Sequence, residues 1–437
     1  MSKKKDSFKP WLSRPAINRS VTIPFTTSLT HRLSSLGEFH PNDLDPFLLF
    51  DARDSMIGTL ENPTLDLDPS KPDTLNVITA TRTGVATFTD ANGLIASAPA
   101  NTVRVDHVDG VPMILVEPSA TNLVPYSEDF SNSLYTKRNS TVTSGFSSPD
   151  GLNNAFKLTA AANEGDVYFV LGGGGGTTKA VSVFAKAASA TSELIIQELG
   201  YTGRSTKFNL NSGAITFSNS AGTSTIQNVG DGWFRCTHIE TYSSGQNTLA
   251  YAYRSTTVDS LYLFGAQIET GSVSTSYIPT SGSTVTRAAD NLVISGSAFS
   301  DFYNQSEGTF YVETNLRTDE NLPHIFEAYN SSATNKRITL YVNSPFNSIA
   351  FFMQNGGTQA NQVSGLANVG QLNRAAYSFK TNNLLCSVNG GTEVADTSAS
   401  IPVDLNTLAI GNLNTALYPL NGHLKRLIYW PVSSDSL

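Results

Sequence analysis

Hydrophobic and polar residues alternate along the last third of the chain. The run GTFYVETNL places large apolar side chains two residues apart, at Phe310 and Val312, and ends on Leu316 in the same phase. A period of two is the pattern of a β-strand with one buried face. Similar runs separated by Gly, Asn and Ser continue to the end of the chain, among them RITLYVN, SIAFFMQ, RAAYSFK, NLLCSVNGG and HLKRLIYWP. Residues 300–437 are therefore predicted to form a domain of antiparallel β-sheet.

A second series of strand-length runs occupies residues 120–295. It includes AVSVFAK, SELIIQEL, STKFNL, GAITFS, WFRCTHIE, TLAYAYR and SLYLFGAQIE. In TLAYAYR the leucine and both tyrosines share one face of the predicted strand, and two alanines share the other. Two sheets packed face to face account for this pattern, so we predict a β-sandwich here.

The first part of the chain follows neither pattern. Eight prolines interrupt residues 1–73, which excludes a long helix or a central strand and predicts an extended segment. Residues 74–119 contain the short runs NVITATR, VATFTD and PMILVEP, with turn chemistry at Asn92-Gly93 and Asp109-Gly110. We predict a small β collar over 74–119. The chain as a whole is thus predicted to be all-β.

Composition and charge fit this prediction and exclude one function. Only 15% of the 437 residues are charged and the net charge is -8, which argues against a general nucleic-acid-binding protein. The charge is segregated, however, because a basic arm with Lys3, Lys4, Lys5, Lys9, Arg14, Arg19 and Arg32 precedes an acidic segment with Glu38, Asp43, Asp45, Asp51, Asp54, Glu61, Asp66 and Asp68. Such a segment lacks a core of its own and can gain one from neighbouring copies, so we expect a homo-oligomer.

The cysteines and the apolar runs indicate in which cellular compartment the chain folds. Cys236 and Cys386 alternate with apolar neighbours in separate predicted domains, as buried strand residues do, and a disulfide framework is not expected. The N-terminal lysines are not followed by the apolar run of a secretory signal, and no apolar stretch is long enough to span a bilayer. We therefore expect folding in a cytoplasm and no membrane insertion.

Two loops resemble ligand-binding motifs on first inspection. LGGGGGTTKA, 171–180, is rich in glycine like a phosphate-binding loop, but Thr177 replaces the second fixed glycine and a strand-like run follows, so a flexible hairpin loop is predicted. DLDPSKPD, 66–73, begins like a calcium-binding loop, but Lys71 replaces the required glycine and Val77 the closing glutamate. Neither loop is predicted to bind its motif's ligand.

Positive evidence for catalysis is missing. The six histidines show no zinc-type spacing with cysteine or with each other, and His238 and His423 lie in strand runs as packed or surface residues do. Carboxylates are plentiful, but none forms a recognisable acid and base pair, and no GxSxG nucleophile turn occurs. We predict no catalytic residues, no metal site, no cofactor and no enzymatic activity.

Three stretches resemble a recurring family of bacteriophage structural proteins. The first is TATRTGVATFTDANGLIASAPANTVRVDHVDGVPMILVEPSATNLVPYSEDFSN, 79–132, which is similar to the block before the sandwich in tail and head fibre proteins. The second, GWFRC with 263–290, resembles the closing part of a carbohydrate-binding-module-like sandwich. The third, LNGHLKRLIYWPVSSDSL, 420–437, resembles the last strand of a concanavalin-A or laminin-G-like jelly roll but ends without the usual helical tail.

This resemblance implies a location and partners. It implies a virion protein, a fibre or spike subunit, which is a homotrimer in the resembling family. The first seventy or so residues of this chain match no known pattern, and we expect them to attach the chain to other virion proteins of the tail, neck, portal or capsid. The lectin-like sandwiches would then contact host surface polysaccharide, with avidity between linked copies raising a weak affinity by roughly 10²–10⁴.

Aromatic residues near loops are the candidate glycan contacts, because a flat aromatic face suits the C–H face of a sugar ring. Most aromatics are predicted to be core residues, including Trp233 and Trp430 in strand runs. Tyr201, Tyr329 and Tyr418 instead fall near loops beside Asn, Ser or Arg, and we predict these three as glycan-binding candidates.

Two alternatives stay open from the sequence. A polysaccharide-degrading tailspike would need a carboxylate pair in a groove. A purely architectural decoration protein would have no ligand, and the sequence does not separate it from the fibre, because a lectin-like fold does not fix function.

Overall fold

A computed structural model describes residues 60, 62–161, 165–172, 176–198, 205–218, 222–241, 248–255, 259–318, 320–413 and 418–437. Over these residues the chain is almost entirely β-strand, and every strand pairing is antiparallel. The all-β prediction is confirmed. The described chain belongs to one compact unit that begins at Leu60, and the basic arm and most of the acidic segment lie outside the described residues.

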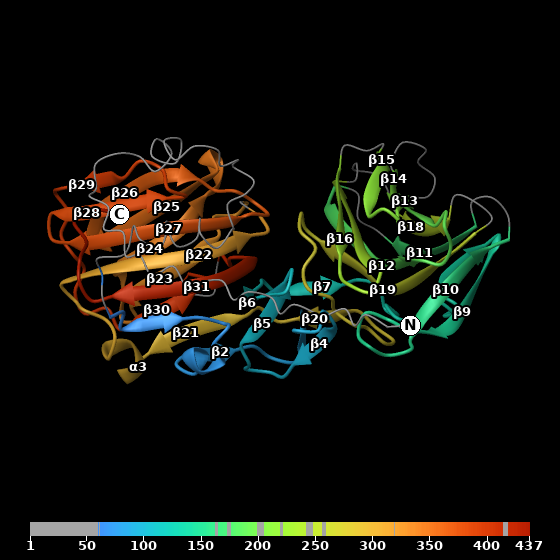
Figure 1. The fold of residues 1–437 in the computed structure, drawn as a ribbon, viewed down its shortest axis with the longest axis horizontal. Coiled ribbons are helices and arrows are strands. Elements are labelled where there is room, and N and C mark those ends of the chain that lie inside the picture. The colour runs from blue at the N-terminus through green and yellow to red at the C-terminus, as the bar shows by residue number, and fades with distance from the viewer. Residues whose placement is uncertain are drawn as a thin grey trace, which may run out of the picture. The chain divides into compact units, whose positions relative to one another are not determined.

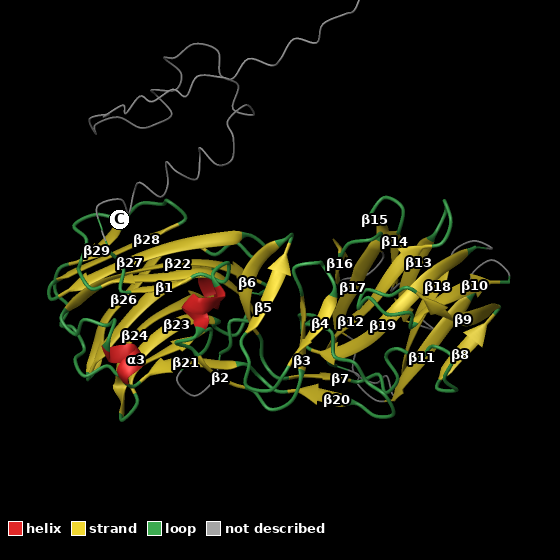
Figure 2. Ribbon diagram, turned by 60° about the horizontal axis from the view of Figure 1, so that its bottom comes forward, coloured by secondary structure: helices red, strands yellow, loops and turns green. Residues whose placement is uncertain are grey.

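Two six-stranded sheets form the sandwich that follows the collar (Figures 1 and 2). One has the order β16-β17-β12-β19-β10-β9 and the other β15-β14-β13-β18-β11-β8. Their strands are β8 (Tyr135–Arg138), β9 (Ser140–Phe146), β10 (Ala155–Ala160), β11 (Asp166–Gly172), β12 (Thr178–Ala187), β13 (Glu193–Glu198), β14 (Ser205–Asn209), β15 (Ala214–Ser218), β16 (Thr223–Asn228), β17 (Trp233–Thr241), β18 (Thr248–Ser255) and β19 (Ser260–Thr270). We call this the first sandwich. Its core contains Val181, Val183, Leu194, Ile196 and Cys236.

The second sandwich consists of an eight-stranded and a seven-stranded sheet. The eight-stranded sheet has the order β29-β28-β27-β22-β31-β6-β5, with β1 also paired to β31, and the seven-stranded sheet has the order β2-β21-β30-β23-β24-β25-β26. The strands are β1 (Leu65–Leu67), β2 (Thr79–Thr81), β5 (Arg104–Val108), β6 (Val111–Val116), β21 (Asn291–Ser295), β22 (Glu307–Leu316), β23 (His324–Asn330), β24 (Ala333–Asn343), β25 (Ser348–Asn355), β26 (Gly357–Leu366), β27 (Leu372–Lys380), β28 (Asn383–Val388), β29 (Val394–Asp396), β30 (Thr407–Ile410) and β31 (Gly422–Trp430).

Strand β31 joins the start of the described chain to its end. Its first part pairs with β6, through Leu424 and Ile114, and its later part pairs with β1, through Leu427 and Leu67. In Figure 1 the blue strand β2 accordingly lies beside β21, and β6 lies beside the red strand β31. Strands of the predicted collar, 74–119, therefore enter both sheets of the second sandwich, and its remaining hairpin, β3 (Ala86–Thr89) with β4 (Ile95–Ala98), pairs with itself.

The predicted hairpin turns are present. Asp109 and Gly110 both have positive φ, 51° and 79°, between β5 and β6, as a tight two-residue turn requires. In the β3–β4 hairpin the carboxylate of Asp90 accepts backbone N–H groups of Asn92 and Leu94, and Gly93 has φ 79°. A further short pair, β7 (Ala120–Asn122) with β20 (Val285–Arg287), holds the two ends of the first sandwich together.

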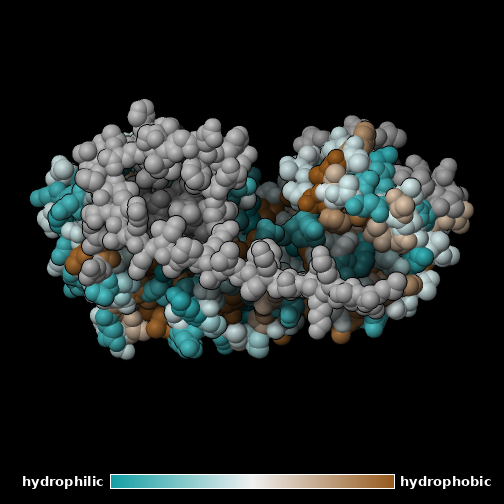
Figure 3. Space-filling view, in the orientation of Figure 1, coloured by the Kyte–Doolittle hydropathy of each residue, from teal (hydrophilic) through white to brown (hydrophobic). Residues whose placement is uncertain are grey.

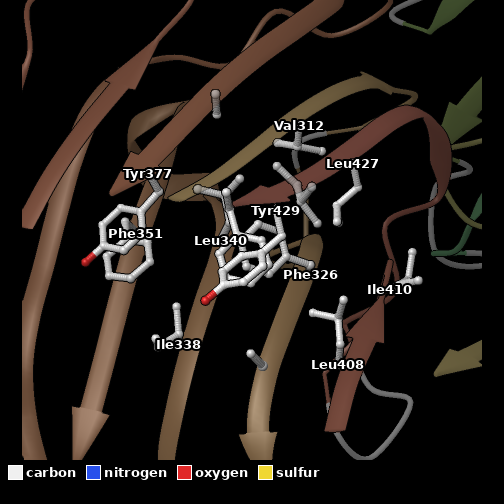
Figure 4. Packing of buried hydrophobic residues seen from close by; sticks show 14 of the residues in the cluster. Val312, Phe326, Ile338, Leu340, Phe351, Tyr377, Leu408, Ile410, Leu427 and Tyr429 are labelled. Carbon is white, nitrogen blue, oxygen red and sulfur yellow. The ribbon is translucent and has the colours of Figure 1, made fainter. Parts of the chain in front are cut away.

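The cores contain the residues that the alternation predicted. Phe310, Val312 and Leu316 are buried in the second sandwich, where Val312 lies near Leu427 and Tyr429 (Figure 4). Cys236 and Cys386 are buried and form no disulfide with each other, and Trp233 and Trp430 are 2% and 5% exposed, so these predictions are confirmed. The helices among the described residues are short: one α-helix, α3 (Ser297–Ser300), and two 3₁₀-helices, η2 (Pro72–Leu75) and η3 (Ser344–Phe346). None of them is long and apolar enough to span a membrane.

One predicted connection is wrong. The glycine-rich loop within 171–180 leads from a strand to a strand, as expected, but β11 and β12 belong to different sheets and do not pair with each other. The loop is thus a crossover between the two layers of the first sandwich, not a hairpin. Sequence alternation identifies each strand but does not specify its partner.

Candidate functional site

The outer face of the seven-stranded sheet is lined with polar and aromatic side chains. Along β24, Ile338, Leu340 and Val342 point into the core, so the intervening Thr339 and Tyr341 point outward. If Thr339 and Tyr341 pointed inward instead, β24 would contribute no apolar side chains to the core. The side of the sheet on which each residue of β24 lies is therefore determined. We call the side of this sheet that faces away from the core the outer face and define it by His324, Glu327, Tyr329, Arg337, Thr339, Tyr341, Phe352 and Asn361. Of these residues, Glu327, Thr339 and His324 are only 0%, 2% and 8% exposed.

A row of aromatic rings crosses the outer face at one end. The rings of His324 and Tyr341, which are register partners on β23 and β24, lie 5.6 Å apart at an interplanar angle of 24°. The rings of Tyr418 and His324 lie 5.6 Å apart at an interplanar angle of 28°. The backbone carbonyl of Tyr418 also accepts the backbone N–H of His324 at 2.9 Å. A register shift between His324 and Phe326 lets His324 face outward although Ile325 and Phe326 are both in the core.

Polar groups surround these rings in a way that suits a hydroxyl-rich ligand. The Tyr341 hydroxyl donates to Asn361 Oδ1 at 3.3 Å. His324 Nδ1 donates to the Leu322 carbonyl at 2.8 Å, which leaves Nε2 as the acceptor of the neutral ring. Burial, together with the nearby charge of Arg337, lowers the pKa of His324 to about 4, although the Leu322 bond acts the other way. The ring is therefore neutral at physiological pH.

The next part of the outer face combines an ion pair with an aromatic ring. The guanidinium carbon of Arg337 lies 5.1 Å from the centre of the Phe352 ring, and Arg337 Nη1 lies 3.5 Å from Glu327 Oε1. The charge of Arg337 is thus compensated within the face. Thr339 Oγ1, Arg337 Nε and Gln354 Oε1 are buried without a hydrogen-bond partner among the described residues, and each such atom costs about 1–3 kcal/mol.

The three predicted tyrosines do not form one site. Tyr418, 41% exposed, is part of the aromatic row, whereas Tyr329 is the register partner of Arg337, five residues along β23 from His324. At about 3.3 Å per residue that separation is about 16 Å. Tyr201 lies outside the described residues. Their role in glycan binding stays a prediction. His324, Tyr341 and Phe352 were missed, although the alternation in RITLYVN and SIAFFMQ marks the last two as outward-facing.

A second cluster, which we call the ionic junction, is buried between the collar and the two sandwiches. Arg104 on β5 lies 2.8 Å from Glu117 and also bonds to Asp290, with these side chains between 0% and 2% exposed. Arg82 donates to the other oxygen of Asp290 at 2.8 Å. Burial alone would raise the pKa of Glu117, but Arg287, Arg104 and Arg317 outweigh it and hold this pKa well below its usual value.

The ionic junction reaches into the second sandwich. Arg317, just after β22, bonds to Glu117, and His423 Nε2 on β31 donates to Asp106 Oδ2 at 2.8 Å. Ser276 from the first sandwich also donates to Glu117 at 2.7 Å. Each carboxylate is thus paired with at least one cation, which makes the junction a connection between domains. His423 is 4% exposed, which confirms that it is packed.

One further group has the residue types of a nucleophilic site. Ser224 Oγ lies 2.9 Å from His238 Nδ1, and His238 Nε2 lies 3.1 Å from Glu240 Oε2. However, His238 is 2% exposed, and Thr206 from the opposite sheet bonds to both it and Ser224. A substrate carbonyl would have to enter between the two sheets to reach the hydroxyl. We interpret the group as a polar network that ties the sheets together.

In the calcium-like loop, 66–73, Lys71 forms an ion pair with a carboxylate of the loop. Lys71 Nζ lies 3.0 Å from Asp68 Oδ2, and Asp68 Oδ1 accepts the N–H of Ser70. The ammonium group of Lys71 therefore pairs with the Asp68 carboxylate, which a calcium ion would need as a ligand. Among the residues that the structure describes, no group of three or more His, Cys, Asp or Glu side chains is placed to hold a metal ion.

Comparison with known proteins gives structural neighbours only. No protein-family model and no curated protein matches the sequence. The carbohydrate-binding module CBM40 of a Ruminococcus gnavus sialidase, solved with α2,3-sialyllactose, matches 30% of this chain and 79% of its own, with 10% identity and a TM-score of 0.28. Mouse laminin α1 domains LG4-5 match 78% and 97%, with 11% identity and a TM-score of 0.24.

A third neighbour is similarly distant. The tandem CBM22 domains of Paenibacillus barcinonensis Xyn10C match 74% of this chain and 100% of their own, with 9% identity and a TM-score of 0.24. The neighbours are thus carbohydrate-binding modules and laminin G-like domains. What this chain binds, and where, has to be inferred from its own residues.

Proposed function

We propose that this chain is a non-enzymatic bacteriophage virion protein, a fibre or spike subunit that binds host surface glycans through the outer face of the seven-stranded sheet. The observation that carries the proposal is the row formed by His324, Tyr341 and Tyr418, three near-parallel rings with an amide at Asn361 beside them. Aromatic faces with polar neighbours are the surface on which sugar rings stack. The resemblance of 79–132 and 420–437 to phage fibre proteins supports the virion role.

The charges of the outer face favour an uncharged sugar. Arg337 is compensated by Glu327, and His324 is neutral because its pKa lies at about 4. An acidic sugar would therefore gain no unpaired cation from these two groups. A neutral hexose has hydroxyls that match His324 Nε2 and the Asn361 side chain. Its C–H face would pack on the exposed ring of Tyr418.

The N-terminal segment would attach the chain to the virion. Strand β1 lies at the edge of the second sandwich, where Thr64 N–H donates to the Tyr429 carbonyl at 3.0 Å. The residues before Leu60 therefore continue from an anchored strand. In this proposal they contact other virion proteins, and the homotrimer implied by the fibre resemblance provides linked binding faces.

Glycan binding is tested with single substitutions and calorimetry on host capsule or lipopolysaccharide oligosaccharides. Tyr418→Ala and Tyr341→Ala should each weaken binding by about 1–3 kcal/mol if a ring stacks on the sugar, by analogy with base stacking on aromatics. Tyr341→Phe, which keeps the ring but loses the hydroxyl, should lose less. Tyr168→Ala is the matched control, because Tyr168 is a partly exposed strand tyrosine of the first sandwich.

The outcomes separate the candidate sites. Unchanged affinity in both alanine variants, with the fold intact, would remove the outer face from consideration. Loss of affinity in the Tyr168 variant instead would move the site to the first sandwich. A similar loss on Tyr329→Ala alone would place the ligand about 16 Å away along β23.

The non-enzymatic part of the proposal has its own test. Purified protein is incubated with host polysaccharide and the chain length of the glycan is followed. We expect no shortening, because the carboxylates of the ionic junction are buried in ion pairs and His238 is enclosed between two sheets. Shortened glycan would overturn this and favour the polysaccharide-degrading tailspike.

Virion attachment is tested by truncation. A chain that begins at Leu60 keeps β1 and should fold and bind glycan but no longer enter particles. Normal incorporation of this truncated chain would contradict attachment through the N-terminal segment. Absence of the protein from purified particles of any kind would contradict the virion role altogether.

A further inference from the structure

Arg235 is an arginine that neutral groups hold beside the ionic junction. Val183 lies in the core of the first sandwich, so the next residue, Phe184, and its register partner on β17, Arg235, lie on the other side of the sheet. The guanidinium carbon of Arg235 lies 5.4 Å from the centre of the Phe184 ring, and its Nη2 donates to Ser182 Oγ at 3.1 Å and to Ser274 Oγ at 2.8 Å. Among the residues that the structure describes, no carboxylate pairs with Arg235, and its Nε is buried without a hydrogen-bond partner.

Around the ionic junction of the described chain, the arginines outnumber the carboxylates by one. The five arginines are Arg82, Arg104, Arg235, Arg287 and Arg317, and the four carboxylates that interact with them are Asp106, Glu117, Glu269 and Asp290. His423 stays neutral and does not change this balance, because burial and the charge of Arg317 lower its pKa, although the bond to Asp106 acts the other way. The junction therefore contains one positive charge in excess, which is costly for a buried group.

Glu269 is the carboxylate whose charge acts most on Arg235, yet neutral donors satisfy it. The backbone N–H of Thr275 donates to Glu269 Oε2 at 2.9 Å, and the side-chain amide of Gln267 donates to the same oxygen at 2.7 Å. The Ser274 hydroxyl separates the two charges, because its oxygen lies 3.4 Å from Glu269 Oε2 and 2.8 Å from Arg235 Nη2. Glu269 thus compensates Arg235 only across a hydroxyl group.

Arg235 and Arg317 lie close enough to repel each other. Burial lowers the pKa of Arg235, and the charge of Arg317 acts in the same direction, whereas the charge of Glu269 opposes it. Arg317 bonds to Glu117 through Nη1, but its Nη2 is 3.9 Å from Asp106 Oδ2, which is too far for a hydrogen bond. The Arg317 side chain is 24% exposed and Arg235 is partly exposed, so solvent reaches both.

We propose that Arg235 and Arg317 together bind a small oxyanion, either the carboxylate of an acidic sugar or free inorganic phosphate. Guanidinium groups match the geometry of two oxygens on a carboxylate or phosphate, and the resulting charge-assisted hydrogen bonds are strong. One bound monoanion would bring the negative charges around the junction to five, equal to the five arginines. Figure 3 shows a described surface that is mainly hydrophilic, with apolar residues in small groups, which suits a small polar ligand. The site shares no residue with the outer face and does not rest on the proposed glycan binding there.

Glu320 acts against an anion at this position. It accepts a hydrogen bond from the hydroxyl of Ser272, two residues before Ser274, and it is exposed. Its negative charge is therefore near the segment that contacts Arg235, where it should repel an approaching anion. Removal of this charge should strengthen binding.

Isothermal titration calorimetry on the full-length chain tests the site. The chain is titrated with sodium glucuronate and, separately, with inorganic phosphate, while sodium chloride keeps the ionic strength constant. Binding of glucuronate alone would identify the sugar carboxylate as the ligand, binding of phosphate alone would identify free phosphate, and binding of both would show that the site accepts either oxyanion. If neither anion binds, the proposal is wrong.

Single substitutions locate the binding. Arg235→Gln should weaken it about 10-fold or more, because a charge-assisted donor is lost, whereas Arg235→Lys keeps the charge and should retain part of the affinity. Glu320→Gln should strengthen binding. The matched control is Lys186→Gln, which removes a cation from the same side of the same sheet that is already paired with Asp231 at 3.0 Å, and it should leave the affinity unchanged. Unchanged binding in Arg235→Gln, or an equal loss in Lys186→Gln, would overturn the proposal.

Hydrogen exchange of the wild type needs no variant and decides the question even if Arg235→Gln does not fold. The bound anion should slow the exchange of the amides of residues 272–276, which include the serine that contacts Arg235, relative to the same concentration of sodium chloride. Unchanged exchange of these amides at an anion concentration that saturates the calorimetric signal would contradict the site. Tyr418→Ala should not alter this response, so failure of the oxyanion site and failure of glycan binding on the outer face are distinguishable.

Discussion

His423 Nε2 donates to Asp106 Oδ2 at 2.8 Å, although the two residues are 317 positions apart in the chain. The bond links β31, the last strand of the second sandwich, to β5 of the collar. Because Arg317 and Glu117 bond close by, the collar is fixed to the second sandwich by a buried network. The stretch 79–132 thus supplies Arg104, Asp106 and Glu117 of the ionic junction, and their partners come from later in the chain: Arg287, Asp290, Arg317 and His423.

Loss of one carboxylate from the ionic junction should be costly. Glu117→Gln leaves the buried cations Arg104 and Arg287 with one negative charge fewer, so we expect the free energy of unfolding to fall by about 3–5 kcal/mol. Denaturant titration measures it. Asp231→Asn, which breaks the exposed pair with Lys186, is the control and should cost about 1 kcal/mol or less. Equal effects in the two variants would contradict the role of the junction.

Stability should fall in mild acid because of His324. Its pKa is about 4 in the folded chain against 6.5 for an unperturbed histidine, so the unfolded state binds more protons between these values. The contribution is complete above pH 6.5 and is lost as the pH falls toward 4. Because the pKa is lower by about 2.5, the contribution amounts to about 3.4 kcal/mol at 1.36 kcal/mol per pKa unit. His324→Gln should remove this part of the pH dependence in unfolding experiments at pH 7 and pH 4.5, and an unchanged pH dependence in this variant would contradict the assignment to His324.

The boundary of the attachment segment should appear at β1. Leu65, Leu67 and Leu75 are in the core of the second sandwich, so a chain that begins at Leu60 should remain stable and one that begins at Thr74 should not. The second truncation also exposes the edge of β31. Thermal unfolding and solubility distinguish the two chains. Leu67→Ala should cost about 2–5 kcal/mol in the full-length protein, as other buried leucines do.

The tyrosines of the aromatic row should contribute little to stability. Tyr418 is 41% exposed, so Tyr418→Ala should change the free energy of unfolding by about 0.5 kcal/mol or less. The buried Tyr429→Ala is the contrasting variant and should cost several times as much, because it opens a cavity beside Phe310. If Tyr418→Ala unfolds the protein, its ring is a core residue and any loss of glycan binding by that variant carries no information about the site.

The sequence alone determined the fold class and the strands, because burial of one face imposes a period of two that is visible locally. Phe310, Val312 and Leu316 show this, as does the hairpin turn at Asp109-Gly110, where positive φ demands particular residues. The outward position of Tyr341 follows from the same alternation. Of the two predicted tyrosines that the structure describes, Tyr418 lies in the aromatic row and Tyr329 does not.

Tertiary structure decided which strands pair and which side chains meet. Nothing local specifies that β31 pairs with β1 and β6, or that the glycine-rich loop crosses between sheets, because strand pairing depends on packing between residues far apart in the chain. The register shift that turns His324 outward toward Tyr418 has the same origin. The alternation of β23 is broken at this shift. The local sequence pattern therefore does not predict that His324, the central ring of the aromatic row, faces outward.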